Sequence, residues 1–273
     1  MMRNSIPIGP MALGREDSPS VIAEMSGNHN QSLGRPRAMA ELENTDIPLI
    51  RKVAATGKPM IISTGMATVA ELAESVEAAR EAGCRNLVLL KCTSTYPATP
   101  ENTTILTIPH PRELFGCEVG LSDHTMSVGV AVASVALGAT GIEKPFTLAR
   151  SDGGVDSASS MEPDEMKSLV VETERAWQAL GQVSYGPTEA ERKSLVFRRS
   201  IYIMKDLKAG DVLTRENVQA IRPGSGLSGK YIEVMIGLRV GRAVPRGTPL
   251  EFGLLDSGAS EGPRSAPRSE EGP

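Results

Sequence analysis

Short apolar runs alternate with longer amphipathic segments over roughly the first two thirds of the chain. Helices are expected between the later runs and after them, at Met126–Leu137, whose small residues could pack closely on a sheet, and at Pro163–Leu180. Strands that alternate with helices predict βαβ units and a parallel sheet, so the fold class is α/β. The runs that read as buried strands are Val21–Ala23, Met60–Ile62, Leu87–Lys91, Cys117–Leu121 and Gly141–Glu143.

The clearest helix is expected at Val69–Ala82. Leu72 and Val76 recur there at helical spacing, which predicts one apolar side. Thr68 precedes the segment and Glu71 follows three residues later, the arrangement of a capping box at a helix start.

The pattern of apolar, glycine and proline residues changes in the last third of the chain. Residues 1–181 form the predicted α/β domain, and residues 182–193 read as a linker because glycine and proline interrupt them. Residues 194–256 contain short β segments separated by glycine-rich turns, which predicts a compact β-rich module. Residues 257–273 consist mainly of Ser, Gly, Pro and charged residues, so a disordered tail is expected.

Composition narrows the class of protein. Aromatic residues are only 3% of the chain, which favours a Val, Ile, Leu, Ala and Met core of the parallel α/β kind. A net charge of −4 argues against nucleic acid as the main partner. Three cysteines without a C-x-x-C spacing fit a reducing compartment, and no signal peptide or 18-residue apolar run is found. We therefore expect a cytoplasmic protein that does not bind membranes.

Polar residues follow two of the predicted strands where each strand ends. Ser122, Asp123 and His124 follow one strand, and Glu143 and Lys144 close the next one before a proline. The carboxyl ends of parallel strands are where α/β enzymes place their chemistry. The alternative for His124 is a histidine that only hydrogen-bonds to nearby backbone.

Other residues have less specific signals. Glu24 is the one carboxylate on the apolar run VIAEMSG, and an unpaired buried carboxylate is costly, so a functional role is favoured. Cys92 lies near a strand end and could be a nucleophile, but a buried thiol is the commoner outcome. His29 is expected to be a hydrogen-bonding turn residue, and His110, between two prolines, is expected in an exposed loop.

Several longer motifs occur in a fixed order: VIAEMSGNHNQS, KPMIISTGMAT, LLKCTSTYPA, VGLSDHT, GIEKPFTLAR, GGVDSASSMEP and RRSIYIMKDLKAGDVLTRENVQAIRPGSGL. In this order they resemble the sialic acid synthase family (N-acetylneuraminate synthase type), and most closely its pseudaminic acid synthases. The resemblance extends over nearly all of residues 21–255.

The resemblance implies a (β/α)₈ barrel followed by a small antifreeze-like (SAF) domain, in a domain-swapped homodimer. It implies condensation of phosphoenolpyruvate with an acetamido sugar and water, which gives a nonulosonic acid and phosphate. The sugar would be a diacetamido trideoxy hexose or a relative of N-acetylmannosamine. A divalent metal, Mn²⁺ or Mg²⁺, would polarise the sugar aldehyde.

The resemblance also assigns roles to individual residues. Glu24 and Glu143 would be the catalytic carboxylates, and His124 would be the first metal histidine. Arg222 would reach the acetamido group in the barrel of the partner subunit. The other implied substrate contacts are Asn28, Ser63, Ser94, Tyr96, Ser122 and Asp156.

Two departures from the family pattern bear on activity. Pro145 stands where the resemblance implies the second metal histidine, so metal binding should be weakened; Glu24, Asp123 or Glu143 could supply oxygen ligands instead. Between Asn30 and Glu41, three βα units of ~30 residues each are missing relative to the family. The family's phosphoenolpyruvate-binding lysines lie on those units, and only Lys91 or Lys144 could replace them.

We therefore expect an incomplete TIM-barrel-derived sheet, because five strands cannot close the usual barrel. The first hypothesis is a nonulosonic acid synthase. The alternative is a non-catalytic remnant that binds a sugar or pairs with an intact synthase. A Schiff-base aldolase is disfavoured because no such lysine signature is evident.

Overall fold

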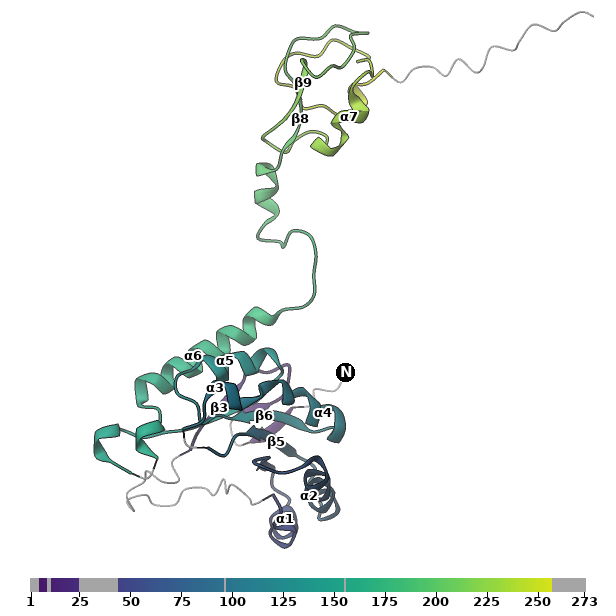
Figure 1. Ribbon diagram of the computed structural model, residues 1–273. Helices are drawn as coiled ribbons and strands as arrows, with labels where there is room; N and C mark the ends of the chain where they lie inside the picture. Colours follow the sequence, from purple (N-terminus) through teal and green to yellow (C-terminus); the bar gives the residue numbers. More distant parts are fainter. Residues whose placement is uncertain (1–4, 9–10, 25–43, 96, 155, 257–273) are drawn as a thin grey trace, which may run out of the picture. The chain divides into compact units, whose positions relative to one another are not determined.

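The computed structural model describes residues 5–8, 11–24, 44–95, 97–154 and 156–256 (Figure 1). The chain divides into two compact units, residues 1–182 and residues 183–273. We call them unit 1 and unit 2, and each is described by itself. The strand ends predicted to hold the chemistry all belong to unit 1.

Unit 1 contains a five-stranded parallel sheet in the order β3-β7-β6-β5-β4, which confirms the predicted α/β class. Every strand overlaps an apolar run predicted from sequence. Among the described residues, β3 and β4 are the two outer strands of this sheet. The strands are β3 Ser20–Glu24, β4 Met60–Ser63, β5 Leu87–Cys92, β6 Glu118–Ser122 and β7 Gly141–Pro145.

Helices connect the strands of unit 1. The sequence predicted α6 with both of its ends, and placed the start of α5 three residues too early. The sequence missed α4, and its His110 lies in this helix rather than in a loop, although it is exposed as expected. The helices are α1 Ile47–Ala54, α2 Val69–Glu81, α3 Pro100–Thr103, α4 Pro109–Phe115, α5 Gly129–Ala136 and α6 Pro163–Leu180, with 3₁₀ turns η1 Ile105–Thr107, η2 Arg150–Asp152 and η3 Ser157–Ser159.

The start of α2 follows the predicted capping box. The Thr68 hydroxyl accepts a hydrogen bond from the Glu71 backbone N–H at 3.3 Å, and the Glu71 carboxylate accepts from the Thr68 N–H at 2.7 Å. Two otherwise unsatisfied backbone donors are thereby paired. Leu72, Val76 and Ala79 then point into the core beneath β4 and β5.

The sheet has two different faces. On one face, helices cover side chains such as Ile62, Leu89, Leu121 and Ile142; we call this the helix-covered face. On the other, a hairpin that sequence analysis missed, β1 (Ile6–Ile8) and β2 (Met11–Leu13), packs on Val88 and Leu90. We call this second face the inner face.

Alternation along the strands decides which side chains belong to the inner face. Cα partners in neighbouring strands share a face, and the register pairs Cys92 with Ser122 and Ser122 with Glu143. Farther along, Glu24 pairs with Pro145. Ser122, Glu143 and Glu24 therefore lie on one face at the carboxyl edge of the sheet.

Unit 2 is built around a two-stranded antiparallel sheet, β8 (Ser200–Ile203) and β9 (Val218–Ile221), with α7 (Ile232–Met235) beside it. The 3₁₀ turns η4 (Arg192–Phe197), η5 (Gly229–Tyr231) and η6 (Phe252–Leu254) complete the described elements. Its core is separate from that of unit 1 and contains Ile201, Ile203, Leu213, Val240 and Leu250. The predicted β-rich module has these short strands and many turns.

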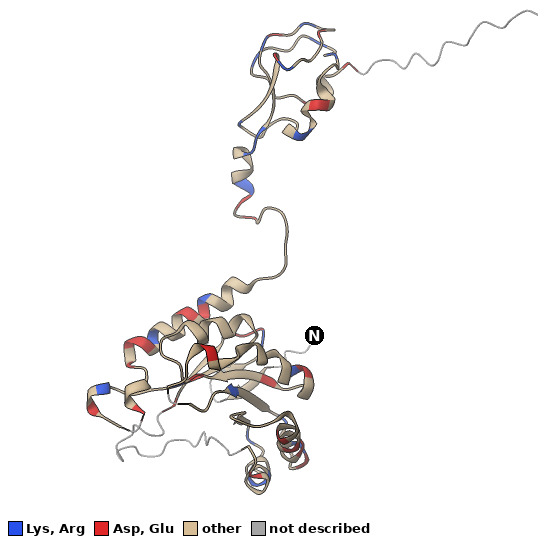
Figure 2. Cartoon of the chain, viewed as in Figure 1, with Lys and Arg blue, Asp and Glu red and all other residues tan. Residues whose placement is uncertain are grey.

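Charge is spread over the structure. Figure 2 shows acidic and basic side chains interspersed along the helices of unit 1. Within the described residues, no helix is both long enough and apolar enough to cross a membrane.

Candidate functional site

The ends of β6 and β7 form a buried polar cluster. The Ser122 hydroxyl donates to Glu143 Oε1 at 2.7 Å and lies 3.2 Å from His124 Nε2. Ser122 is 1% exposed, His124 3% and Glu143 6%. One hydroxyl thus links an imidazole and a carboxylate from neighbouring strands, an arrangement that can hold or move a proton. We call these three residues the Ser122 cluster.

Glu24 extends this cluster toward the outer strand β3. It is half-buried at the end of β3, and its carbonyl accepts a hydrogen bond from the Phe146 N–H at 2.8 Å. Its carboxylate is close enough to act on the His124 charge. Alternation places Glu24 on the inner face with Glu143, so the two predicted catalytic carboxylates share one face.

The electrostatics of His124 combine opposing effects. Burial lowers the pKa of His124 below its ordinary value, and the positive charge of Lys144 lowers it further. The carboxylates of Glu24, Asp123 and Asp156 act in the opposite direction. The net direction is downward, so the neutral imidazole is favoured. A neutral imidazole can accept a proton or bind a metal.

Pro145 fits the end of an internal strand for a structural reason. The register between β6 and β7 ends at the pair Ser122 and Glu143, two residues before the proline. The Pro145 carbonyl accepts from the Met161 N–H at 2.8 Å, and the next donor, Phe146 N–H, bonds to Glu24. The missing proline N–H therefore interrupts no pairing of β6 with β7.

Other predicted substrate contacts lie around this edge. Ser63 ends β4, half-buried, and its carbonyl accepts from Asn44 Nδ2 at 3.1 Å. Ser94 is exposed in the loop after β5, near Gly65. Asp156 is half-buried, and its backbone carbonyl accepts from the Ser160 hydroxyl at 2.8 Å. None of these positions tests the assigned roles, which stay predictions.

Four residues singled out from the sequence cannot be related to this site. Asn28, His29 and Tyr96 lie outside the described residues. Arg222 follows β9 in unit 2 and is exposed. Its proposed role in a partner subunit remains a prediction.

Two lysines that could have replaced the family's phosphoenolpyruvate lysines are engaged elsewhere. Lys144 is 1% exposed, and its ammonium lies 3.0 Å from Asp123 Oδ2. Lys91 donates to the Cys92 carbonyl at 2.9 Å and to Thr93 Oγ1 at 2.7 Å, and burial lowers its pKa. Strand alternation places both lysines on the helix-covered face of the sheet. Lys144 is thus held in an ion pair away from solvent, and its suggested role as a replacement for the family's lysines stays a prediction.

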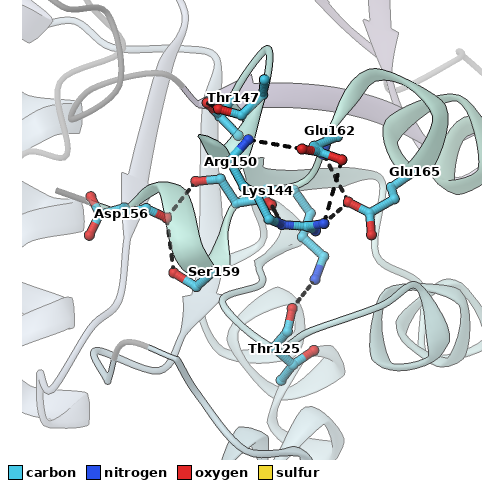
Figure 3. A network of polar contacts seen from close by, with 10 residues as sticks. Thr125, Lys144, Thr147, Arg150, Asp156, Ser159, Glu162 and Glu165 are labelled. Carbon is cyan, nitrogen blue, oxygen red and sulfur yellow. Dashed lines mark hydrogen bonds and ion pairs between the residues drawn. The ribbon is translucent and has the colours of Figure 1, made fainter. Parts of the chain in front are cut away.

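A network around Arg150 was not anticipated from sequence (Figure 3). The Arg150 guanidinium bonds to Glu165 and donates through Nε to the Ser160 carbonyl at 3.0 Å, and its backbone N–H donates to Glu162 Oε1 at 2.8 Å. Glu162 and Glu165 also form the capping box of α6. The network fixes the loop that carries Asp156 to the start of α6.

The described residues do not fit a divalent metal. Within the part of the chain that the structure describes, no group of three His, Cys, Asp or Glu side chains could hold one. Pro145 offers no ligand atom, and both Asp123 oxygens are engaged by Lys144 and Thr125. An Asp123 oxygen could bind a metal only by giving up one of these contacts, and the suggestion that it serves as a ligand stays a prediction.

Two cavities lie at the opposite end of the sheet, and they share Arg15 and Asp17. One of about 670 Å³ is lined by the starts of β5 and β6, and one of about 690 Å³ by the ends of α5 and α6. None of the predicted site residues lines either cavity. The chemistry-bearing groups are at the carboxyl end, where α/β enzymes bind their substrates.

A parallel βα sheet with a polar carboxyl edge, together with a small β-rich unit, defines a two-part α/β protein. The family model described as the NeuB family matches residues 38–185, and a SAF domain matches residues 198–255. The chain belongs to the NeuB family. Its fold is an incomplete TIM-barrel-derived sheet with a C-terminal SAF domain, as expected from the five strands and the SAF-like motifs.

Named relatives agree with this assignment. The chain is 39% identical over 215 residues to the pseudaminic acid synthase of Campylobacter jejuni subsp. jejuni serotype O:2, covering 79% of this chain and 63% of the relative. It is 34% identical over 198 residues to the N,N'-diacetyllegionaminic acid synthase of the same organism, covering 71% of this chain and 59% of the relative.

A solved structure is also similar. The N-acetylneuraminic acid (sialic acid) synthetase from Leptospira borgpetersenii serovar Hardjo-bovis matches with a TM-score of 0.52 and 30% identity, covering 56% of this chain and 53% of that one. The chain spans about three fifths of the length of the curated relatives it matches.

Proposed function

We propose that this chain is a nonulosonic acid synthase. It would condense phosphoenolpyruvate with a diacetamido trideoxy hexose, or with a sugar like N-acetylmannosamine, and water to give a nonulosonic acid and phosphate. The observation that supports this most is the Ser122 cluster, buried at the carboxyl edge of a NeuB-family sheet. The synthase names of the relatives support the reaction class.

In the proposed reaction, Glu24, Glu143 and His124 each have a different role. The methylene carbon of phosphoenolpyruvate forms the new C–C bond to the sugar aldehyde carbon, whose oxygen takes up a proton. Water adds at the carbon that bears the phosphate, and the C–O bond to phosphate breaks. Glu24, on the inner face, would take the proton of that water. Glu143, held by Ser122, would orient His124 toward the oxygen that develops charge.

Two further parts of the proposal come from the family alone. The working form would be a domain-swapped homodimer in which Arg222 contacts the acetamido group bound to the partner subunit. The divalent cation that the resemblance implies, Mn²⁺ or Mg²⁺, would need further ligands, because the described residues offer no set of three and residue 145 is proline. Neither nucleic acid nor membrane is proposed as a partner, and the proposed compartment is the cytoplasm.

A second function is favoured by two specific observations. Pro145 removes an expected metal ligand, and the chain spans only about three fifths of its relatives. Both features suit a non-catalytic remnant that binds a sugar or pairs with an intact synthase. Such a remnant would bind its ligand without releasing phosphate.

The deciding experiment measures phosphate release from phosphoenolpyruvate with Mn²⁺, with and without the diacetamido sugar. Circular dichroism and size-exclusion chromatography first establish that the sample is folded. A synthase gives sugar-dependent release that is lost in Glu24→Gln. The matched control is Glu174→Gln, an exposed residue of α6.

The outcomes separate the two functions. Sugar-dependent release by the wild type and by Glu174→Gln, but not by Glu24→Gln, supports the synthase. No release from a folded sample that still binds the sugar in calorimetry favours the remnant. Release that is unaffected by Glu24→Gln contradicts the role of Glu24.

A further inference from the structure

Asp123 and Lys144 form an ion pair that is withdrawn from both solvent and the inner face. Asp123 is 0% exposed and Lys144 1%, with 3.0 Å between Oδ2 and Nζ. Ion pairs buried this deeply contribute little more stability than apolar residues of the same volume. What such a pair fixes is geometry, so the question is which geometry depends on it.

The pair closes a turn of four residues, Ser122 to Thr125. Asp123 Oδ1 accepts from the Thr125 N–H at 2.9 Å and from the Thr125 hydroxyl at 2.8 Å. The Lys144 ammonium donates to the Thr125 carbonyl as well as to Asp123. Thr125 is therefore held through its amide, hydroxyl and carbonyl.

Backbone bonds hold the same turn from two sides. The Asp123 N–H donates to the Glu143 carbonyl at 2.9 Å, which continues the pairing of β6 with β7. The His124 carbonyl accepts from the Ala98 N–H at 3.1 Å. His124 is thus enclosed between two fixed neighbours, and its ring faces Ser122 on the inner side.

We propose that Asp123 is a positioning residue, which locks the Ser122–Thr125 turn through Thr125 so that Ser122 and His124 meet Glu143, while Lys144 balances its buried charge. This proposal rests on the function proposed above, because it concerns the same site. Neither side chain touches a reacting group, because strand alternation places both on the helix-covered face of the sheet. They act through the backbone and through Thr125.

Two double variants separate positioning from plain structural support. Asp123→Asn/Lys144→Met removes both charges but keeps an oxygen acceptor for the Thr125 N–H and hydroxyl. Asp123→Leu/Lys144→Met removes both charges and the acceptor. Each avoids leaving one charge buried alone, so both are expected to fold. They differ only in the turn-closing acceptor.

The first readout is the imidazole signal of His124 in a ¹H–¹³C spectrum at fixed pH. The chain has only three histidines, and His110→Gln and His124→Gln assign the signals. Asp123→Leu/Lys144→Met is expected to shift the His124 signal and leave that of His110 in place. Asp123→Asn/Lys144→Met is expected to leave both near their wild-type positions.

The second readout is binding of phosphoenolpyruvate by calorimetry. The leucine variant is expected to bind about tenfold more weakly than the asparagine variant, a difference of about 1.4 kcal/mol. Equal His124 signals in the two double variants would overturn the proposal. So would a shifted His124 signal in the asparagine variant, because charge and not the turn would then be responsible.

A milder pair of variants keeps the test valid if the leucine variant unfolds. Thr125→Val removes only the hydroxyl, whereas Thr125→Ser retains it. The His124 signal should shift in the valine variant alone, and a shift in both or in neither would overturn the proposal. The spectrum can be recorded without turnover. If the chain proves inactive, the proposed function fails, but the inference about the turn can still be tested.

Discussion

His124 lies where the neutral imidazole is favoured, and this has a consequence for stability. Burial is the largest cause that lowers its pKa in the folded chain. Between the folded and the unfolded pKa, the unfolded chain binds more protons. Stability therefore rises with pH over this interval and is lost as the pH falls below about 6.5, the value expected for an unfolded histidine.

We predict that the free energy of unfolding decreases as pH is lowered from about 7.5 to about 5.5, and that His124→Gln flattens this decrease. A single group contributes at most about 1.4 kcal/mol per pH unit. Urea unfolding at several pH values measures the slope. His110→Gln, at an exposed position of α4, is the matched control and should leave the slope unchanged.

Pro145 is the residue at which the structure departs most clearly from the expected metal site. It is buried at the end of β7, in register with Glu24. Alternation puts any side chain at position 145 on the inner face beside Glu143. A histidine there would add an imidazole to a face that already contains His124.

Pro145→His is therefore predicted to strengthen Mn²⁺ binding by about tenfold or more, or ~1.4 kcal/mol per decade. Calorimetry with Mn²⁺ and no substrate gives the affinity. Pro145→Ala is the control, because it removes the proline without adding a ligand. Equal affinities in the two variants would show that residue 145 does not limit metal binding.

The contact between β6 and β7 depends on a glycine. A Cβ at Gly120 would lie 2.6 Å from Leu90 Cδ2 and closer still to the Gly141 carbonyl oxygen. Backbone oxygen in a paired strand cannot move aside without breaking the pairing. The strands that carry Ser122 and Glu143 are therefore held at a distance that no larger residue allows.

Gly120→Ala is predicted to destabilise unit 1 by about 1–3 kcal/mol, the usual cost of overpacking a core. Gly129→Ala is the matched control, since a Cβ there meets nothing within 4 Å and alanine favours the helix it begins. Urea unfolding compares the two variants. A stable Gly120→Ala chain would contradict the close approach.

Sequence patterns located the elements of unit 1 well for physical reasons. The runs of β5 and β6 are apolar and buried on both faces, so they stand out without any knowledge of their partners. The hairpin of β1 and β2 was missed because each strand has only three residues. Its stability comes from packing on Val88 and Leu90, which no local pattern reveals.

The site was predictable only in part. Alternation correctly placed Glu143 and residue 145 on one face. It did not reveal that Asp123 and Lys144 would pair on the other face, because that requires the register between β6 and β7. The Arg150 network joins residues up to 15 positions apart through a loop, and loop geometry has no periodicity to read.

At the scale of the whole molecule, the main question is what pairs with the two outer strands of the sheet. Among the described residues, β3 and β4 are the outer strands. In the chain, residues 25–43 lie between them. About two fifths of the length of the curated relatives lies outside the part that matches this chain. Open strand edges pair readily with other chains, so edge closure should govern the solution behaviour of unit 1.

We predict that unit 1 forms oligomers whose size depends on concentration. Replacing residues 25–43 with the three βα units that the family resemblance implies at this place is expected to give a species of defined size. Added strands would pair with β3 and β4, and closing the sheet removes the free edges. Size-exclusion chromatography with light scattering over a range of concentrations measures the change.

The same chimaera tests whether the missing βα units or the proline at position 145 limits turnover. If the missing segment is the main defect, the chimaera should release phosphate only when the sugar is present, and Glu24→Gln in the chimaera should abolish release without changing its size. If the chimaera has a defined size but stays inactive, Pro145→His should be added to it. Activity gained at that step would assign the remaining defect to the metal ligand. Continued inactivity would contradict the synthase proposal for the residues this chain still contributes.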